Sequence, residues 1–350
     1  MKRVWLAAVV AVLGLAAPAY ATFPGGNGRI AYSWSRGGGA FEAGPNPRLV
    51  GVVSVRPDGS GRRLVARGGV SPKYSPGGRR IAFLRDHRLW VAKADGDDAV
   101  PVTPKGWLVG GHEWSPGGMR MAFARGLKNG GDALYTVEPD GSGLRRLLRS
   151  PQPINISSGP WAPDGKAIVY EQSSGRPLVR VVRAGVISTL ARPASRPTWS
   201  RGGLIAYEAP VPAERRAQVC ITRAARKTPI RCIGFADASV TRPIWSPLGD
   251  RLVVTYAGPG GEPVELWTVR PDGTVLTRTP KAEHSSPIFS PPIFSPDGGS
   301  LAFNRTRFAG DPRLFFTDLL IQRSDGTDRR LLVRGGQAET QDWQPLRRSR

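Results

Sequence analysis

Short apolar segments recur along the chain, each placed behind a turn that contains glycine. Each repeat begins with an aromatic residue, followed by Ser-Pro or a close variant, a Gly turn, two polar residues and an apolar triplet. Copies begin at these aromatic residues: Tyr74, Trp114, Trp161, Trp199, Trp245 and Phe294, with a last, shorter copy at Trp343. Consecutive aromatic residues are 38 to 49 residues apart, a spacing that suits four-stranded propeller blades.

The remaining strands of each unit can be read between these anchors. An apolar triplet such as Ile81-Ala82-Phe83 is typical of a strand that is covered on both faces. The next strand ends at Asp-Gly in five units, and Asp-Gly supplies the positive φ that tight hairpin turns need. These turns are Asp58-Gly59, Asp95-Gly96, Asp140-Gly141, Asp272-Gly273 and Asp325-Gly326. A fourth strand, such as residues 61–67, completes the unit, and no convincing helix appears after residue 21.

The order of the units predicts a ring that is closed by the two chain ends. The first unit starts at residue 28 with no aromatic strand before it, whereas Trp343 has no further strands behind it. Every aromatic strand has a following set of strands if Trp343 completes the first blade. We therefore predict an all-β fold, a β-propeller of seven four-stranded blades, with six blades as the alternative if one unit is degenerate. Closure of the ring would remove exposed sheet edges.

The N-terminus has the pattern of a secretory signal. Lys2 and Arg3 precede an apolar run, and the segment ends in Ala19-Tyr20-Ala21, a small-x-small cleavage site. The predicted organisation is a signal peptide over residues 1–21, a propeller over 22–345 and a basic tail over 346–350. We expect an exported monomer, in the periplasm, in the cell envelope or secreted, with no transmembrane segment after signal cleavage.

The charge of the chain is strongly basic. The formal net charge is +23, and +21 remains once Lys2 and Arg3 are removed. A field of this sign attracts polyanions. The arginines are spread through every segment, so coding bias over solvated faces is the plainer interpretation. For an exported chain we expect an envelope or secreted protein, or an anionic envelope polymer, as the partner, and no nucleic acid.

Histidine and cysteine are scarce, with 3 and 2 copies. This argues against multi-His metal centres and cysteine-rich zinc modules, and the Asp-Gly turns lack the further ligands of a calcium loop. We expect no metal and no other cofactor. Cys220 and Cys232 lie on consecutive strands of one unit, in a hairpin that folds around Arg226. Because exported chains meet oxidising conditions, we predict a disulfide between them; two buried thiols are the alternative.

Several polar residues lie just before the innermost strands, where the connections between units surround one mouth of the channel. Loops on a rigid scaffold often carry function. We predict that the binding face comprises His112, Glu113, Arg196, Arg242, Glu283, His284, Glu339 and Thr340. The alternative at each of these positions is an ordinary polar loop residue with no role in binding.

The repeated unit, written P-x-W-S-P-x-G-x-x-I-A-F and followed by L-W-V-x-x-x-D-G, closely resembles the WD-like (PD40) repeats of the TolB family of exported propellers. That resemblance covers about residues 28–345 and implies a scaffold that binds other envelope proteins through one face. A second resemblance is to the propellers of prolyl-oligopeptidase-type peptidases, but the nucleophile motif G-x-S-x-G does not occur. We therefore expect a non-enzymatic binding protein, with a lyase or glycosidase at the channel mouth as the alternative.

Overall fold

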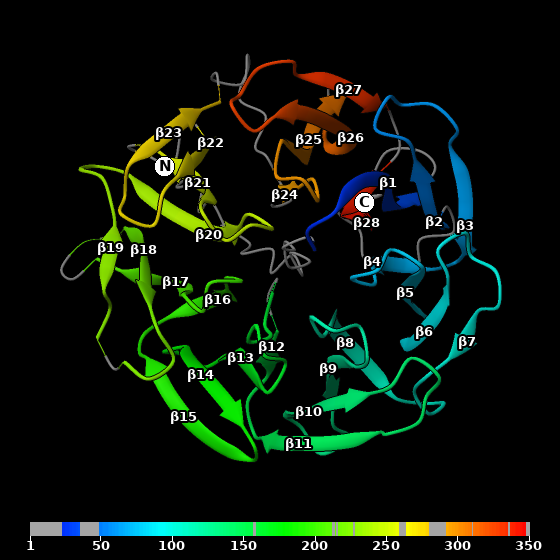
Figure 1. Ribbon diagram of the computed structural model, residues 1–350, viewed down its shortest axis with the longest axis horizontal. Coiled ribbons are helices and arrows are strands. Elements are labelled where there is room, and N and C mark those ends of the chain that lie inside the picture. The colour runs from blue at the N-terminus through cyan, green and yellow to red at the C-terminus, as the bar shows by residue number, and fades with distance from the viewer. Residues whose placement is uncertain are drawn as a thin grey trace, which may run out of the picture.

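Seven four-stranded blades stand around a central axis in the computed structural model, and two of them, one of which contains both the first and the last strand, are joined into one eight-stranded sheet (Figure 1). The structure describes residues 23–35, 49–156, 159–211, 214, 216–226, 228–258, 264–279, 292–309, 311–334 and 337–347. Only the backbone is described for residues 49, 307–309, 311–315 and 337–340. Over these ranges the fold is all-β, with no helix, so the predicted seven-bladed propeller is confirmed.

We number the blades in chain order and give the strands of each from the inner to the outer edge. Blade 1 contains β28 (Gln337–Leu346), β1 (Gly26–Ser35), β2 (Leu49–Val55) and β3 (Arg63–Arg67). Blade 2 contains β4 (Val70–Tyr74), β5 (Arg80–Arg85), β6 (Arg88–Lys93) and β7 (Val100–Pro101). Blade 3 contains β8 (Leu108–Trp114), β9 (Met121–Gly126), β10 (Asp132–Val137) and β11 (Arg145–Ser150). Blade 4 contains β12 (Ile154–Asn155), β13 (Ala167–Gln172), β14 (Leu178–Arg183) and β15 (Val186–Ala191).

The last three blades follow the same order. Blade 5 contains β16 (Ser195–Trp199), β17 (Ile205–Pro210), β18 (Ala217–Thr222) and β19 (Arg231–Ile233). Blade 6 contains β20 (Ser239–Trp245), β21 (Leu252–Ala257), β22 (Val264–Val269) and β23 (Val275–Arg278). Blade 7 contains β24 (Ile293–Phe294), β25 (Ser300–Ala309), β26 (Asp311–Arg323) and β27 (Arg330–Val333).

The C-terminal strand closes the ring, as predicted. Strand β28 pairs antiparallel with β1, and Trp343 lies opposite Ile30. In Figure 1 the red C-terminal strand accordingly lies beside the blue N-terminal one. A single parallel bridge between Thr317 and Gln337 also connects blade 7 to blade 1. The inner edge of blade 1 therefore depends on a strand from the opposite end of the chain.

The repeated tryptophans pack between neighbouring blades. Trp114, Trp245 and Trp343 are each 1% exposed. The indole N–H of Trp114 donates to the carbonyl of Lys73 on the inner strand of the preceding blade at 3.0 Å, and Trp245 does the same to Thr198 at 3.3 Å. The core is thus a series of apolar layers between blades, which is why each blade needs its neighbours.

The hairpin turns use the expected chemistry. In the first Asp-Gly turn, Gly59 has a φ of 88° and the Asp58 carboxylate accepts the N–H of Ser60 at 2.8 Å. On β18 and β19, Cys220 lies directly opposite Cys232, and the structure joins them by a disulfide. This bond fixes the short outer strand of blade 5.

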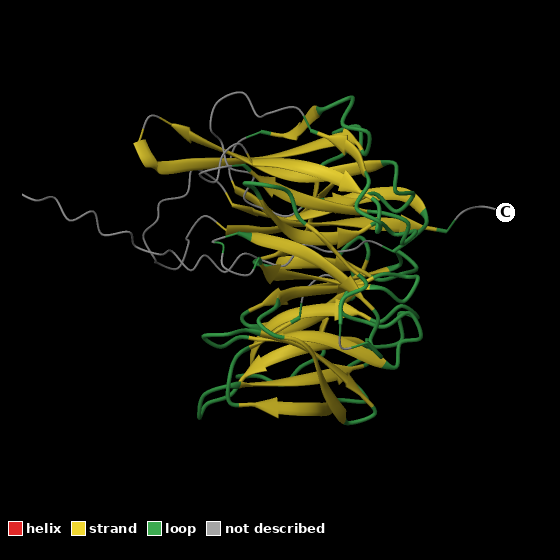
Figure 2. Cartoon of the chain, turned by 90° about the vertical axis from the view of Figure 1, so that its left-hand side faces the viewer, coloured by secondary structure: helices red, strands yellow, loops and turns green. Residues whose placement is uncertain are grey.

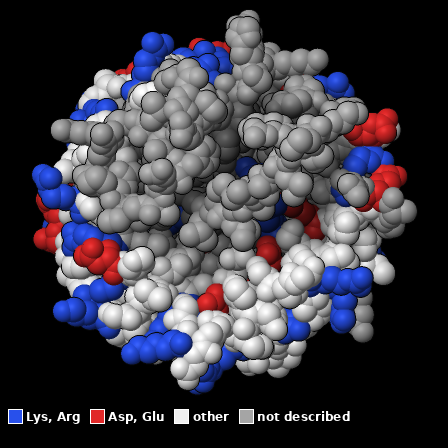
Figure 3. All heavy atoms as spheres, turned by 180° about the vertical axis from the view of Figure 1, so that it is seen from behind, with Lys and Arg blue, Asp and Glu red and all other residues white. Residues whose placement is uncertain are grey.

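The two ends of the channel differ. At the SP-turn face the inner strands end in the Ser-Pro turns, and the C label of Figure 2 marks this side. At the opposite side, which we call the mouth face, the inner strands begin. Figure 3 shows the mouth face, with a hollow near its centre in which both basic and acidic atoms are visible.

The predicted signal peptide lies outside the described residues. Within the described residues, the structure contains no helix that could span a membrane.

Candidate functional site at the channel mouth

Two arginines at the mouth face have an unusual backbone conformation. Arg196 is the second residue of the inner strand of blade 5 and has a φ of 46°, and Arg242 has a φ of 53° in the inner strand of blade 6. Both lie three residues before the repeated tryptophan, where the ladder to the second strand is interrupted. Positive φ is uncommon for residues other than glycine, so other contacts must hold these two in place.

The stabilising contacts come from the preceding blade. The N–H of Arg196 donates to Oε2 of Glu171 on β13 at 3.0 Å, and the N–H of Arg242 donates to Oε1 of Glu208 on β17 at 2.5 Å. Ser71, at the equivalent position of blade 2, has a φ of 55°. In each pair with glutamate, a carboxylate on a second strand accepts the N–H that the ladder leaves unpaired.

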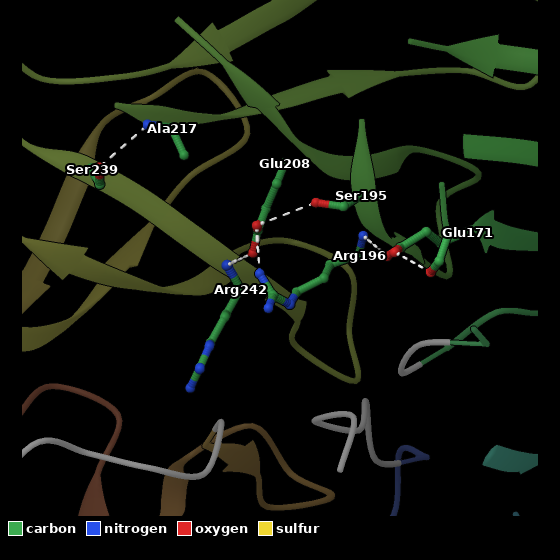
Figure 4. Close-up of polar contacts among 8 residues, drawn as sticks. Glu171, Ser195, Arg196, Glu208, Ala217, Ser239 and Arg242 are labelled. Carbon is green, nitrogen blue, oxygen red and sulfur yellow. Dashed lines mark hydrogen bonds and ion pairs between the residues drawn. The ribbon is translucent and has the colours of Figure 1, made fainter. Parts of the chain in front are cut away.

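Glu208 is at the centre of this site (Figure 4). Its side chain is only 8% exposed, although its carboxylate faces two arginines. Oε2 accepts a hydrogen bond from Nη1 of Arg196 at 2.7 Å and a longer one from Ser195 Oγ at 3.4 Å. A buried carboxylate with charged and main-chain donors makes strong, directional bonds. Glu208 therefore fixes parts of two inner strands relative to each other.

The network continues into blade 4 through Glu171. Oε1 of Glu171 accepts a hydrogen bond from Ser173 Oγ at 2.9 Å, and Asn155 Nδ2 donates to the same hydroxyl at 2.8 Å. Polar contacts thus extend across blades 4, 5 and 6 at the mouth face. Such a network holds its members in defined positions and specifies a single arrangement.

The guanidinium groups have different surroundings. The side chain of Arg196 is 49% exposed and turns back to Glu208, whereas that of Arg242 extends away from Glu208 (Figure 4). Burial and the charge of Arg196 lower the pKa of Arg242, and Glu208 opposes this shift. Arginine nevertheless stays protonated in proteins. The mouth therefore contains two guanidinium groups, and a guanidinium is a planar cationic donor that suits a carboxylate or another anion.

The other predicted residues are not brought to this site. His112 and Glu113 lie in β8, where they are 2% and 4% exposed, so they belong to the packed channel wall and not to a surface loop. Glu283 and His284 lie outside the described residues. For Glu339 and Thr340 the structure describes only the backbone, as part of β28. Of the predicted set, Arg196 and Arg242 alone are shown close to each other at the mouth.

Glu171 and Glu208 were absent from the predicted site. Both follow the tyrosine of an apolar second strand, in AIVYEQ and LIAYEA, where other units continue with Leu84 or Ala124. A glutamate at the same position of two adjacent units could have indicated this site from the sequence. Within the described ranges, no group of three or more His, Cys, Asp or Glu side chains could hold a metal ion.

Comparisons with known proteins place the chain among β-propellers. No family model matches it. An alignment over 114 residues is 26% identical to the uncharacterized peptidase YuxL of Bacillus subtilis, and it covers 30% of this chain and 17% of that protein.

Three solved structures share the fold at low identity. TolB from Acinetobacter baumannii is 16% identical, with 91% of this chain and 67% of that chain covered and a TM-score of 0.52. A puromycin hydrolase is 14% identical, with 91% and 54% covered and a TM-score of 0.63. An oligogalacturonate lyase in complex with manganese is 13% identical, with 88% and 85% covered and a TM-score of 0.54. The chain thus spans about half of the hydrolase.

These findings support a β-propeller of the TolB kind, but they contradict the expectation that the protein is not an enzyme. The curated relative is named a peptidase, and the hydrolase and the lyase both have higher TM-scores than TolB. The expectation relied on the missing G-x-S-x-G motif, which bears on peptidases with a serine nucleophile and not on other enzymes.

Proposed function

We propose that this protein is an enzyme with its substrate site at the channel mouth, and that it cleaves an anionic sugar chain by elimination. The observation that carries the proposal is the group of Arg196, Arg242 and Glu208. One buried carboxylate holds a guanidinium and a main-chain N–H in place, while the second guanidinium extends away from it. Two guanidinium groups at one mouth suit a substrate that bears carboxylates.

The comparison with the lyase supports an enzyme whose site lies on the propeller. The oligogalacturonate lyase matches over 88% of this chain and 85% of that chain. The net charge of +21 that remains once Lys2 and Arg3 are removed would also draw an anionic polymer toward the protein. The pattern of residues 1–21 leads us to place the protein outside the cytoplasm. Anionic polymers of this kind occur there.

The proposed chemistry uses charge stabilisation. In an elimination, a base removes the proton next to the sugar carboxylate, a carbon–carbon double bond forms and the glycosidic oxygen leaves with the bonding electrons. Negative charge accumulates on the carboxylate as the proton departs. A guanidinium at that carboxylate would stabilise the developing charge more than the ground state, which is the requirement for catalysis. Arg242 is our candidate for that role and Arg196 for substrate binding.

The test is to incubate the purified protein with galacturonate oligomers and with neutral hexose oligomers, following the ultraviolet absorbance of the new double bond. We expect product only from the anionic oligomers. Arg196→Ala and Arg242→Ala should each lower kcat/KM about ten-fold or more, because a hydrogen bond to a charged group contributes roughly 1.5 to 3 kcal/mol. Arg145→Ala, on exposed outer strand β11, is the control of equal charge. Absence of unsaturated product from every anionic oligomer would refute the proposal.

A second candidate is a propeller that selects peptides for a peptidase. It is favoured by the peptidase name of the curated relative and by the TM-score of the puromycin hydrolase. In this case the mouth arginines would bind the carboxylate of a peptide C-terminus. Peptides with free and with amidated C-termini distinguish the two candidates, because only the peptidase proposal expects Arg242→Ala to weaken binding of the free form selectively.

A further inference from the structure

One position of the inner strands is charged in three consecutive blades. It directly precedes the repeated aromatic residue and is occupied by Asp342 in blade 1, Lys73 in blade 2 and Glu113 in blade 3. In the other blades the position is uncharged, with Pro160, Thr198, Ile244 and Ile293. We call the three charged residues the seam row. Their signs alternate around one side of the channel wall.

The seam row is withdrawn from solvent. Asp342, Lys73 and Glu113 are 5%, 0% and 4% exposed. Removal of a charge from water costs several kcal/mol per ion unless other groups compensate it. The propeller repeat does not require this cost, because the remaining blades use uncharged residues at the same position. A role specific to these blades is therefore needed to explain the row.

The row lies where the ring is closed. Asp342 belongs to the C-terminal strand β28, and its Oδ2 accepts the N–H of Tyr74 on β4 at 2.6 Å. Two residues further on, Gln344 Nε2 donates to the carbonyl of Gly78 at 2.8 Å. Both bonds attach the C-terminal strand to blade 2, outside its own sheet. The charge state of the row thus bears directly on the contact between the chain's last strand and the next blade.

The charges of the row do not balance. It contains two carboxylates and one ammonium group. Oε1 of Glu113 accepts the N–H of Trp114 at 3.1 Å, while Oε2 accepts no hydrogen bond from the described residues. An ionised Glu113 would leave one buried negative charge uncompensated. We propose that Glu113 holds a proton in the folded protein, which makes the seam row a proton-binding site that stabilises the closed ring.

The surroundings agree with this assignment. Burial raises the pKa of Glu113 to about 8, although Lys73 opposes the shift, and burial raises the pKa of Asp342 to about 6. Burial lowers the pKa of Lys73 to about 7. The other titratable groups that face the row are also buried: His112 lies near Lys73, and Tyr74 lies near Asp342.

The direction of the pH effect follows from the pKa of Glu113. In the folded protein this pKa is above its ordinary value of 4.5. The folded state therefore keeps a proton that the unfolded state releases, and the resulting stabilisation is complete below pH 4.5 and lost as the pH rises toward 8. Lys73 and His112 act in the opposite direction because their pKa values are lowered. Comparison of the natural protein with a variant that lacks the Glu113 carboxyl isolates the part of the pH dependence that requires this carboxyl.

The decisive variant is Glu113→Gln, which imitates the protonated form at every pH. Denaturant unfolding should be measured for both proteins from about pH 5 to about pH 8. The unfolding equilibrium constant of the natural protein should increase about ten-fold or more relative to the variant over this window, since one pKa unit corresponds to a ten-fold change. Glu265→Gln is the control, because Glu265 is 8% exposed and lies in blade 6, away from the seam. Parallel pH profiles of the natural protein and Glu113→Gln would overturn the proposal.

A second measurement places the effect at the seam. Backbone hydrogen exchange, corrected for the intrinsic effect of pH, should accelerate in residues 341–346 of β28 more than in β20 as the pH rises, and Glu113→Gln should abolish the difference. Equal acceleration in both strands would also contradict the proposal. If Glu113→Gln does not fold, the exchange profile of the natural protein still decides: faster exchange in residues 341–346 than in β20 between about pH 5 and about pH 8 supports the proposal, and equal acceleration overturns it.

Discussion

Glu208 and Arg242 are joined by a hydrogen bond that crosses from blade 5 to blade 6, with the Arg242 N–H 2.5 Å from Oε1. Glu171 and Arg196 repeat this relationship one blade earlier, at 3.0 Å. In both pairs the donor has a positive φ and the acceptor lies on the second strand of the preceding blade. The repetition shows that the mouth is positioned by the rigid part of the blades, which is the condition for a preorganised site.

Glu208→Gln should therefore disturb both stability and the mouth. The amide can still accept one N–H, but its NH2 group would face the guanidinium of Arg196. We expect a loss of about 1 to 3 kcal/mol in unfolding free energy, the range for a buried hydrogen bond to a charged group. Urea unfolding measures it.

The control for Glu208→Gln is Asp164→Asn. Asp164 pairs with Arg183 at 3.0 Å on the surface, with side chains 45% and 53% exposed. An exposed pair of this kind contributes about 0 to 1 kcal/mol. Equal losses of unfolding free energy in the two variants would mean that Glu208 contributes no more to stability than an ordinary surface carboxylate.

The architecture could be predicted because the repeated residues are the ones that make the contacts between blades. Trp114 shows this: its ring fills the space between blades 2 and 3, and its N–H donates to Lys73. The position of Trp343 at the end of the chain predicted the closure of the ring in the same way, because it lacked strands of its own.

The site could be predicted only in part. Arg196 and Arg242 were found from their place before an inner strand. Glu208 was missed because an apolar second strand predicts core, and the reason for its burial lies in two other strands. Glu113 was expected in a loop because its buried charged neighbours, Lys73 and Asp342, are distant in the sequence and come together only in the ring.

The repeated tryptophans allow a matched comparison of one hydrogen bond. Trp245 donates its indole N–H to Thr198, whereas the N–H of Trp199 has no acceptor among the described residues. Replacement by phenylalanine removes similar apolar surface in both cases. Trp245→Phe should thus destabilise the protein by about 1 kcal/mol more than Trp199→Phe, the net contribution of a buried hydrogen bond. Thermal and urea unfolding would reveal this, and equal losses would rule out a contribution from the indole bond.

The bond between Cys220 and Cys232 should contribute measurably to stability. The two residues are separated by 12 positions, and closure of a loop of about this length is associated with about 3 kcal/mol in the chain-entropy model. The double variant Cys220→Ala and Cys232→Ala should lose about that amount in urea unfolding. Dithiothreitol should lower the stability of the natural protein to that of the variant and leave the variant unchanged. If dithiothreitol leaves the stability of the natural protein unchanged, this prediction is contradicted.

His112 should make the protein sensitive to acid. Burial, with the nearby charge of Lys73, lowers its pKa from 6.5 to about 3. Between these values the unfolded chain binds a proton that the folded protein excludes, so stability is complete above pH 6.5 and is lost as the pH falls toward 3. At about pH 4.5 this loss approaches about 3 kcal/mol. His112→Gln should remove most of it, whereas His87→Asn, at an exposed turn residue, should not. Urea unfolding at neutral and acidic pH provides the measurement, and a His112→Gln variant that loses stability in acid as steeply as the natural protein would show that other groups cause the sensitivity.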